Sequence, residues 1–274
     1  MKKSQLIYQY IREQRAVSKQ DIVIGLGLSL PTITQNLNNL AELGLIDTSK
    51  KISNTGGRNA IAYSYVEKAR YAVGLYLNRH HINCVAVDLS GNVISLIRVR
   101  ENFDLNDDNY LRKIGETVEE VKKDTGLPDD RFLGVGIAVQ GLISDDGERV
   151  TYGLTLNFTG VTRADIAKYI PYHNRLFHDS AAAGYAEVWD RNDLDDAFYL
   201  SLSNSVGGAV IVANKIFEGE RRKSGEIGHM TIIPKAGDRC YCGQRGCFDT
   251  VCRANVLAEY ADGDLEKFFE LLET

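Results

Sequence analysis

The stretch that decides the fold reads Gly225-Glu-Ile-Gly-His229, followed by Cys240-Tyr-Cys-Gly-Gln-Arg-Gly-Cys247. It gathers three thiols and one imidazole, and sulfur and imidazole nitrogen are the ligands that Zn²⁺ prefers in closed structural sites. Glycines 243 and 246 let the backbone curl so that the thiols can face one ion. The sequence therefore predicts one tetrahedral zinc ion per chain, bound by His229, Cys240, Cys242 and Cys247.

Two other interpretations of these cysteines are open. They can be free thiols in a reducing cytosol, which leaves the clustering of four donors on a glycine-rich turn unexplained. They can form a disulfide, which is disfavoured because the N-terminus has no signal peptide. Cys252, the next cysteine along the chain, is not needed to complete a tetrahedron.

Outside this stretch, the 274 residues have the composition of a soluble protein with two or three domains. No apolar run approaches the ~20 residues of a membrane helix, so we expect a cytoplasmic protein without a membrane partner. Residues 1–70 carry ten basic and five acidic side chains, whereas the remainder carries 22 basic and 32 acidic ones. This asymmetry indicates a polyanion partner for the N-terminal part, although charged side chains also serve simply as solvated surface.

The basic N-terminal part alternates helical patterns with cap residues. A helix is predicted over 3–14, and Ser18 opens a second helix with a capping box. A third helix is predicted over 30–43, with Ser29 as its N-cap, Pro31 in its first turn and Gly44 as its C-cap. Two short helices joined by a glycine-containing turn are typical of a helix-turn-helix motif.

The helix over 30–43 has an unusual outer face. Its buried stripe is predicted at Ile33, Leu37, Leu40 and Leu43, and the remaining face carries amides and hydroxyls without a charge until Glu42. Such side chains suit hydrogen bonding to base edges, although a merely polar surface helix would look similar. We expect DNA contacts from Thr32, Thr34, Gln35, Asn36 and Asn39.

Residues 46–66 predict a β-wing, in which two strand-like segments flank Gly56-Gly-Arg58. An Arg at a glycine-rich tip can lie along phosphates or enter a minor groove, so Arg58 joins the expected DNA contacts. The whole order resembles winged helix-turn-helix repressors. The resemblance implies a DNA-binding domain over 1–68 and binding of operator DNA by a dimer or higher oligomer.

From residue 69 onward, strand patterns alternate with helical patterns, which indicates an α/β domain with a mixed sheet. The predicted strands cover 71–77, 82–88, 93–99, 132–139, 198–202 and 208–213. The predicted helices cover 109–123, 180–189 and 254–272, the last broken at 262–264.

The motifs of this body resemble the ROK family (repressors, open reading frames and kinases), which has the actin-like, hexokinase-like ATPase fold. The resemblance rests on Gly134–Gly141, His178-Asp179, Val206-Gly-Gly208 and the opening stretch, and it extends over most of the chain. It implies that 69–274 is a sugar-sensing ROK domain. With the N-terminal module, this is the layout of ROK sugar-responsive repressors, such as those for xylose or N-acetylglucosamine genes.

ROK kinases need two phosphate loops, whose glycines let backbone N–H groups approach phosphate and whose first Asp helps to hold Mg²⁺. At the first loop this chain has Tyr76-Leu-Asn-Arg-His80, without the Asp or the glycines. At the second it has Ser203-Asn-Ser-Val-Gly-Gly-Ala209, with two glycines kept. The losses favour a regulator without catalytic residues over a sugar kinase. A kinase that binds ATP through other contacts is the alternative.

The sugar-binding motif is better kept. In the family an Asn-Asp pair, the Glu and His of Glu-x-Gly-His, and an acid after the last zinc Cys hold sugar hydroxyls. Asp179 occupies the general-base position of the kinases, and a role as a helix N-cap is its second explanation. His229 would serve both sites, with one ring nitrogen for each. The resemblance implies a sugar site of Asn157, His178, Asp179, Glu226, His229 and Asp249.

Three departures affect these expectations. His178 replaces the family Asn and Asp249 replaces Glu, so the sugar itself stays open. Repressors of this class usually continue well beyond the zinc site, so the resemblance implies a truncated or naturally short second lobe. We expect a zinc-containing, sugar-responsive repressor of carbohydrate-utilisation genes. The alternatives are a sugar kinase and a DNA-binding protein that no longer senses a sugar.

Overall fold

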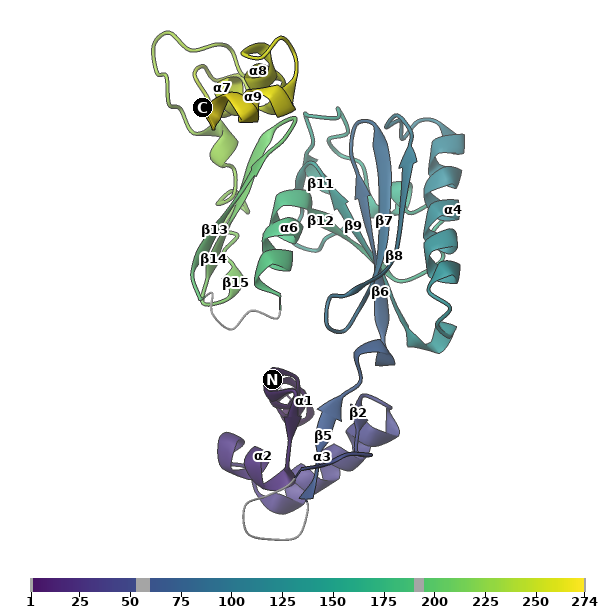
Figure 1. Ribbon diagram of the computed structural model, residues 1–274. Coiled ribbons are helices and arrows are strands. Elements are labelled where there is room, and N and C mark those ends of the chain that lie inside the picture. The colour runs from purple at the N-terminus through teal and green to yellow at the C-terminus, as the bar shows by residue number, and fades with distance from the viewer. Residues whose placement is uncertain (1, 53–59, 190–194, 274) are drawn as a thin grey trace. The chain divides into compact units, whose positions relative to one another are not determined.

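Figure 1 shows the computed structural model of the chain, which describes residues 2–52, 60–189 and 195–273. The chain divides into two compact units. The first comprises residues 1–72, 87–94 and 127–133, and the second comprises 73–86, 95–126 and 134–274. The domain boundary expected between 68 and 69 stays a prediction. In the described part of the chain, no helix combines the length and the apolar character needed to cross a membrane.

Three helices form the core of the first unit: α1 (Lys3–Gln14), α2 (Lys19–Leu26) and α3 (Leu30–Glu42). The predicted capping box is present, since the Asp21 carboxylate accepts a hydrogen bond of 2.8 Å from the Ser18 N–H and the Ser18 hydroxyl accepts one from the Asp21 N–H. Gly27 and Gly44 follow α2 and α3 with φ of 60° and 67°, as glycines that end helices commonly do. The helices bury an aliphatic core of Ile7, Ile11, Ile22, Ile33, Leu37 and Leu40.

Two details of α3 differ from the prediction. Leu43 was assigned to the buried stripe but is 55 % exposed, because α3 ends at Glu42 and Leu43 already belongs to the cap. Ser29 precedes the helix as predicted, yet its hydroxyl lies 2.9 Å from that of Thr32 and makes no capping bond to the backbone.

Short antiparallel strands complete the first unit. β5 (Tyr63–Tyr65) lies between β1 (Ala16–Val17) and β2 (Ile46–Asp47). β3 (Lys51–Ile52) pairs with β4 (Ala60–Ile61), at the base of the segment predicted as a wing. The tip of that segment, including Arg58, lies outside the described residues.

The main sheet has the strand order β12-β9-β6-β7-β8. β6 (Tyr71–Leu77) and β7 (His81–Asp88) show the two-residue burial alternation of strands, and β8 (Val93–Arg100) follows them. β9 (Phe132–Val139) and β12 (Asn174–His178) are parallel, with Val139 opposite His178. The carboxyl ends of these two strands therefore meet at one edge of the sheet, where open α/β sheets commonly bind ligands.

Helices α4 (Asp108–Asp124) and α6 (Asp179–Val188) lie on opposite sides of the main sheet (Figure 1). Beyond α6 lies an antiparallel sheet in the order β13 (Ala197–Leu202), β14 (Val206–Val212) and β15 (Lys215–Ile216). A Cβ on Gly184 would lie 2.7 Å from the Cβ of Ala209, so glycine is what lets α6 approach β14 closely.

The predicted C-terminal helix is broken where expected: α8 (Ala254–Glu259) is followed by α9 (Leu265–Leu272), which the Asp264 carboxylate caps. Other short elements escaped the sequence analysis. These are the strands β1, β12 and β15 described above, together with β10 (Leu142–Ile143), β11 (Val150–Tyr152), α5 (Arg163–Ile166), α7 (Asp249–Cys252) and the 3₁₀ turns η1 (Glu67–Ala69), η2 (Asp129–Arg131) and η3 (Ile227–His229).

Candidate functional site

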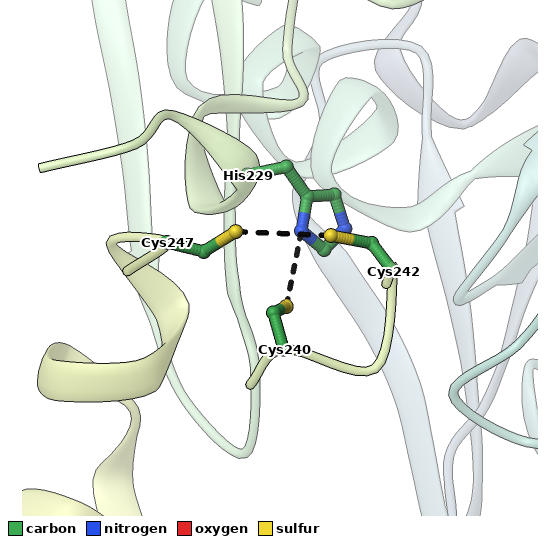
Figure 2. A group of neighbouring side chains, drawn as sticks. All are labelled: His229, Cys240, Cys242 and Cys247. Carbon is green, nitrogen blue, oxygen red and sulfur yellow. Dashed lines mark hydrogen bonds between the residues drawn. The ribbon is translucent and has the colours of Figure 1, made fainter. Parts of the chain in front are cut away.

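Four side chains converge near the C-terminal end of the second unit: His229, Cys240, Cys242 and Cys247 (Figure 2). Their donor atoms all lie within 4.8 Å of one another. The Cys240 Sγ is 3.6 Å from the His229 Nδ1, and the Cys242 and Cys247 sulfurs are 3.7 Å apart. The turn that brings the thiols together contains Gly243 and Gly246, whose φ values of 92° and 68° favour glycine.

The donor set fits a closed tetrahedral metal site. Two sulfurs that each lie ~2.3 Å from a tetrahedral Zn²⁺ are about 3.8 Å apart, close to the observed separation. A disulfide would require about 2.05 Å, so the Cys242 and Cys247 sulfurs are not bonded to each other. Burial raises the pKa of the Cys240 thiol and raises that of Cys247 to about 12. The raised pKa values mean that the protonated thiols are favoured at neutral pH. A bound divalent cation would favour the deprotonated thiolates instead, because metals bind the thiolate.

A pocket with an empty volume of about 560 Å³ opens next to this cluster. The carboxyl ends of β9 and β12 supply Gln140 and His178, α6 supplies Asp179, and the segment around η3 supplies Glu226 and His229. The structure thus brings four of the six predicted sugar-site residues into one cavity, and each has a side chain only 17–23 % exposed.

Carboxylates and imidazoles alternate along one wall of the pocket. The His178 Nε2 lies 3.6 Å from the Asp179 Oδ1 and 3.7 Å from the Glu226 Oε1. The His229 Nε2 lies 3.8 Å from the Glu226 Oε2, while its Nδ1 faces the thiols. His229 therefore presents one ring nitrogen to the cluster and the other to the pocket wall. Metal-binding imidazoles commonly hydrogen-bond to a carboxylate through their second nitrogen, and Glu226 is the carboxylate nearest to that nitrogen here, at a distance longer than a hydrogen bond.

Asp179 is the first residue of α6, and His178 occupies the cap position. The alternative that Asp179 is the N-cap is therefore wrong, although its Oδ1 does accept a hydrogen bond of 2.7 Å from the Ser180 N–H. Burial raises the pKa of Asp179, while the neighbouring His178 acts in the opposite direction. Burial and the charge of Asp179 together raise the pKa of Tyr76 to about 12, so its phenol stays protonated at neutral pH.

The two other predicted sugar-site residues lie elsewhere. Asn157 is exposed, has φ of 55°, and does not line the pocket. Asp249 is only 1 % exposed, and its Oδ1 accepts a hydrogen bond of 2.7 Å from the Val206 N–H. Their roles toward a sugar stay predictions.

Two tyrosines of the pocket were missed by the sequence analysis. Tyr241 stands between two metal-site cysteines, and its ring packs edge-on against His229 at a centroid distance of 5.0 Å. Tyr152 reaches the pocket from β11, a strand that the sequence analysis did not identify. The position of Tyr241 inside the cysteine motif was a usable signal, whereas nothing local pointed to Tyr152.

In both stretches that correspond to phosphate loops, side chains of the protein itself accept hydrogen bonds from backbone N–H groups. In the first, the Asn78 side chain accepts hydrogen bonds from the N–H groups of His80 and His81, at 3.0 and 2.9 Å. In the second, the Val206 N–H donates to Asp249. These three N–H groups are already satisfied within the chain and do not point freely toward a ligand.

The predicted DNA contacts on α3 differ in availability. Gln35 and Asn39 are exposed, whereas Thr32, Thr34 and Asn36 are half-buried. The Asn36 amide nitrogen donates a hydrogen bond of 2.8 Å to the Thr32 carbonyl within the helix. Gln35 and Asn39 therefore present the side chains that are freest to meet a partner.

Comparison with known proteins places these features in one family. A model of the ROK family matches residues 72–269. The xylose repressor of Bacillus subtilis is 25 % identical over 267 residues, which cover 92 % of this chain and 66 % of the repressor. The N-acetylglucosamine repressor of Escherichia coli O157:H7 is 24 % identical, with coverage of 93 % and 63 %. The chain thus spans just under two thirds of the length of these relatives.

Solved structures show the same fold. A ROK family transcriptional regulator, described as a homolog of the E. coli MLC protein, matches with a TM-score of 0.75 and 20 % identity over 94 % of this chain and 66 % of that one. A ROK hexokinase from Thermus thermophilus matches with a TM-score of 0.57 and 24 % identity over 74 % and 69 %. These likenesses support the actin-like, hexokinase-like fold for the body of the chain.

Proposed function

The chain belongs to the ROK family, and from that premise we propose that it is a DNA-binding transcriptional regulator, acting as a repressor of carbohydrate-utilisation genes. The observation that carries the proposal is a difference, within the second unit, between the sugar pocket and the stretches that correspond to phosphate loops. The pocket keeps carboxylates and imidazoles suited to sugar hydroxyls, while in the two stretches that correspond to phosphate loops of ROK kinases the chain's own side chains accept hydrogen bonds from backbone N–H groups.

The pocket has the chemistry of a sugar site. Asp179 and Glu226 offer carboxylate oxygens that accept hydrogen bonds from hydroxyl groups, and charge-assisted hydrogen bonds of this kind are among the stronger ones. Imidazole and phenol groups of His178 and Tyr241 add donors nearby. We assign the sugar contacts to these residues and His229, with Asn157 and Asp249 as further proposed contacts.

The assignment as a regulator without enzymatic activity rests on the phosphate loops. A kinase cradles phosphate with free backbone N–H groups and with cations. Here Tyr76 stands in the place of the metal-binding Asp, and the Asn78 side chain takes the N–H groups of the turn that follows. These features support loss of nucleotide binding.

Zinc is the metal that we assign to His229, Cys240, Cys242 and Cys247. When bound, it would supply structural cross-linking between the turn that carries the thiols and the segment that carries Glu226. The other contacts of His229 come from residues of the pocket wall. The Glu226 carboxylate lies 3.8 Å from the His229 Nε2, and Tyr241 packs edge-on against the His229 ring at the pocket wall.

We assign the first unit to DNA binding as a winged helix-turn-helix. α3 would lie in the major groove with Gln35 and Asn39 at base edges, Thr32, Thr34 and Asn36 beside them, and Arg58 at or near the minor groove. One such module reads only a few base pairs. Specific binding therefore calls for two modules, which implies a homodimer or higher oligomer on a palindromic operator.

Thermal denaturation with a panel of monosaccharides, their N-acetyl forms and their phosphates tests the sugar site. A ligand at a hundred times its dissociation constant stabilises the folded state by about 2.7 kcal/mol, which is readily detected. If no member of the panel shifts the midpoint at millimolar concentration, the sugar-sensing part of the proposal is refuted.

One observation favours the second candidate, a ROK sugar kinase: Asp179 stands in the pocket at the general-base position of the family. A coupled assay with ATP, Mg²⁺ and the sugar that binds separates the two functions. We expect no turnover, whereas rates of ~1–100 s⁻¹ are typical of kinases and would establish the enzyme instead.

A further inference from the structure

The antiparallel sheet beyond α6 has a long edge that is open to pairing. Its strand β13 (Ala197–Leu202) pairs with β14 on one side, and no strand of the described residues pairs with its other side. The unpaired side of an edge strand presents backbone N–H and C=O groups that can pair with a strand of another chain. The open side of β13 is therefore a surface to which a further strand can be added.

This edge lacks the protection that other edges of the chain carry. Natural proteins commonly block an edge with charged side chains, a proline or a very short strand. Among the described edge strands of five or more residues, β8 carries exposed Arg98 and Arg100, and β12 carries exposed Arg175. The remaining one, β13, reads Ala-Phe-Tyr-Leu-Ser-Leu and has neither a charge nor a proline. Of these edges, β13 is thus the one suited to pairing.

The two faces of β13 differ in what covers them. Helix α6 packs on one face of this sheet (Figure 1), where a Cβ on Gly184 would lie 3.2 Å from the Tyr199 Cβ. Side chains alternate along a strand, so Phe198, Leu200 and Leu202 lie on the opposite face, where they are 55 %, 43 % and 45 % exposed. A contiguous row of exposed apolar side chains is typical of an interaction surface.

A second copy of this chain is the partner that the edge fits. When two copies of one strand pair antiparallel about a two-fold axis, each side chain meets a side chain of the same strand. A charged strand would then oppose its own charge, whereas β13 has none. Centring the pairing on Leu200 puts Leu200 opposite Leu200 and Phe198 opposite Leu202, so the apolar faces of the two copies stay together.

The residues that flank β13 are compatible with this register. Asp195 and Asp196 precede the strand, and the Asp196 carboxylate accepts a hydrogen bond of 2.9 Å from the Ala213 N–H of its own hairpin. With Leu200 at the axis, both aspartates reach toward residues 203–205 of the second copy, the uncharged turn between β13 and β14. Like charges placed directly opposite each other would be destabilising, and this register places none there.

We propose that two copies of the chain pair antiparallel through β13, with Leu200 at the two-fold axis, and join their three-stranded sheets into one of six strands. One strand pair is small beside the ~800 Å² per partner of a standard interface, so we expect a dissociation constant in the micromolar range. The inference gives a location to the homodimer of the proposed function, but its evidence depends on neither the sugar, the metal nor DNA.

Sedimentation velocity of the full, zinc-loaded chain at micromolar concentrations tests the inference. We expect a monomer–dimer equilibrium that ends at the dimer, because the pairing uses the open edge of both copies. Leu200→Lys should weaken the dimer at least about tenfold, since it places like charges opposite each other at the axis. Leu96→Lys is the control, because Leu96 is an exposed leucine on the edge strand β8, and it should leave the dimer unchanged.

Cysteine cross-linking tests the register without adding a charge. Residues directly opposite each other in an antiparallel pair have Cα atoms ~4.5–5.5 Å apart, within the range of a disulfide. Leu200→Cys should therefore give a covalent dimer on its own under mild oxidation. Phe198→Cys and Leu202→Cys should cross-link when mixed but not alone, because the same position in the two copies is then offset by roughly 13 Å along the strand. The native chain gives the background from its own cysteines.

The inference and the proposed function fail in distinguishable ways. A chain that stays monomeric, or that grows beyond the dimer, would overturn the inference. The same holds for a dimer that Leu200→Lys leaves intact, or one in which Phe198→Cys alone cross-links as well as the mixture. The proposed function would survive these results, since it requires two modules but no particular interface. Dimerisation through β13 in a chain that binds neither sugar nor operator DNA would refute the proposed function and support the inference.

Discussion

His229 is the residue on which the two halves of the site depend. Its Nδ1 faces three thiols, and its Nε2 faces the Glu226 carboxylate in the pocket wall. A metal at the first nitrogen fixes the second as an N–H donor, so the metal determines the hydrogen-bonding character of the pocket. The metal cluster is therefore part of the proposed binding site as well as a structural cross-link.

Replacing one thiol of the cluster tests the connection between the metal and the sugar pocket. Cys242→Ser should lower the zinc content from about one ion per chain to near zero, because three ligands hold Zn²⁺ far less well than four. It should also weaken sugar binding, since Glu226 and His229 lose their support. The matched control is Cys252→Ser, which removes a half-buried thiol outside the cluster. Metal analysis by mass spectrometry measures both variants, and an equal zinc content in Cys242→Ser would contradict the assignment.

Asp179 allows a test by pH. Its folded-state pKa is raised by burial, so protonation favours the folded state. For such a group, stability is greatest at low pH and is lost as the pH rises through the folded-state pKa. Asp179→Asn should therefore make the chain more stable than the native protein at neutral pH. The gain should shrink as the pH falls, while sugar binding is lost at every pH.

Urea denaturation of both proteins at a series of pH values measures this difference. Asp165→Asn is a useful contrast. Its carboxylate accepts hydrogen bonds from Thr162, which lower the pKa of Asp165. That variant should be less stable than the native protein at neutral pH and should approach it in acid. If Asp179→Asn is destabilising at neutral pH, burial is not what governs this carboxyl.

At the scale of single elements, two serines precede helices in the first unit but act differently. The Ser18 hydroxyl accepts a hydrogen bond from the Asp21 N–H, whereas the Ser29 hydroxyl makes no capping bond. Ser18→Ala should therefore destabilise α2 by about 1 kcal/mol, and Ser29→Ala should have a much smaller effect on α3. Hydrogen exchange of the α2 and α3 amides in the full chain measures both. Equal losses of protection would contradict the difference in capping.

Helix α3 carries the prediction for DNA. Gln35→Ala should weaken binding to the operator by ~1–3 kcal/mol and change binding to random DNA little, because a base contact carries sequence information. Gln9→Ala is the matched control, since Gln9 is also an exposed glutamine and lies on α1. Competition binding in a fixed salt concentration measures both variants. An unchanged operator affinity for Gln35→Ala would remove α3 from the interface.

The local features of these elements were predictable, and the contacts between them were not. The Ser18–Asp21 box, the glycines after α2 and α3, and the cysteine turn are all encoded within a few residues, so sequence patterns find them. The hydrogen bond from Val206 to Asp249 joins residues 43 positions apart, and its consequence for the second phosphate stretch appears only in three dimensions. The same holds for the approach of Tyr76 to Asp179.

The candidate site residues show the same limit of prediction from sequence. His178, Asp179, Glu226 and His229 belong to contiguous motifs, and the structure brings them to one pocket. Asn157 was predicted from a more weakly defined segment and is exposed outside the pocket. Asp249 keeps its place after Cys247, the last cysteine of the metal cluster, but its side chain accepts a hydrogen bond from the Val206 backbone N–H. Motif position thus fixes where a residue enters the fold, and the partners of its side chain depend on neighbours that are distant in sequence.

At the scale of the whole molecule, the two proposed tasks, DNA binding and sugar binding, belong to two different units. The first presents an exposed polar helix face on a basic segment, and the second holds the pocket and the metal cluster. A regulator requires that these tasks be coupled, so that a ligand in the pocket changes the free energy of DNA binding. Coupling free energies in proteins are typically about 1–3 kcal/mol, which corresponds to a ~5–150-fold change in affinity.

The measurement that tests this claim most directly is a titration of the full chain into a labelled operator duplex, followed by fluorescence anisotropy. The operator is selected from a random library with the protein itself, and the ligand is the sugar that raises the thermal midpoint most. We predict that saturating sugar changes the operator affinity at least about fivefold, with no effect of ATP. An operator affinity that is the same with and without sugar, while calorimetry shows the pocket to be saturated, would contradict the account.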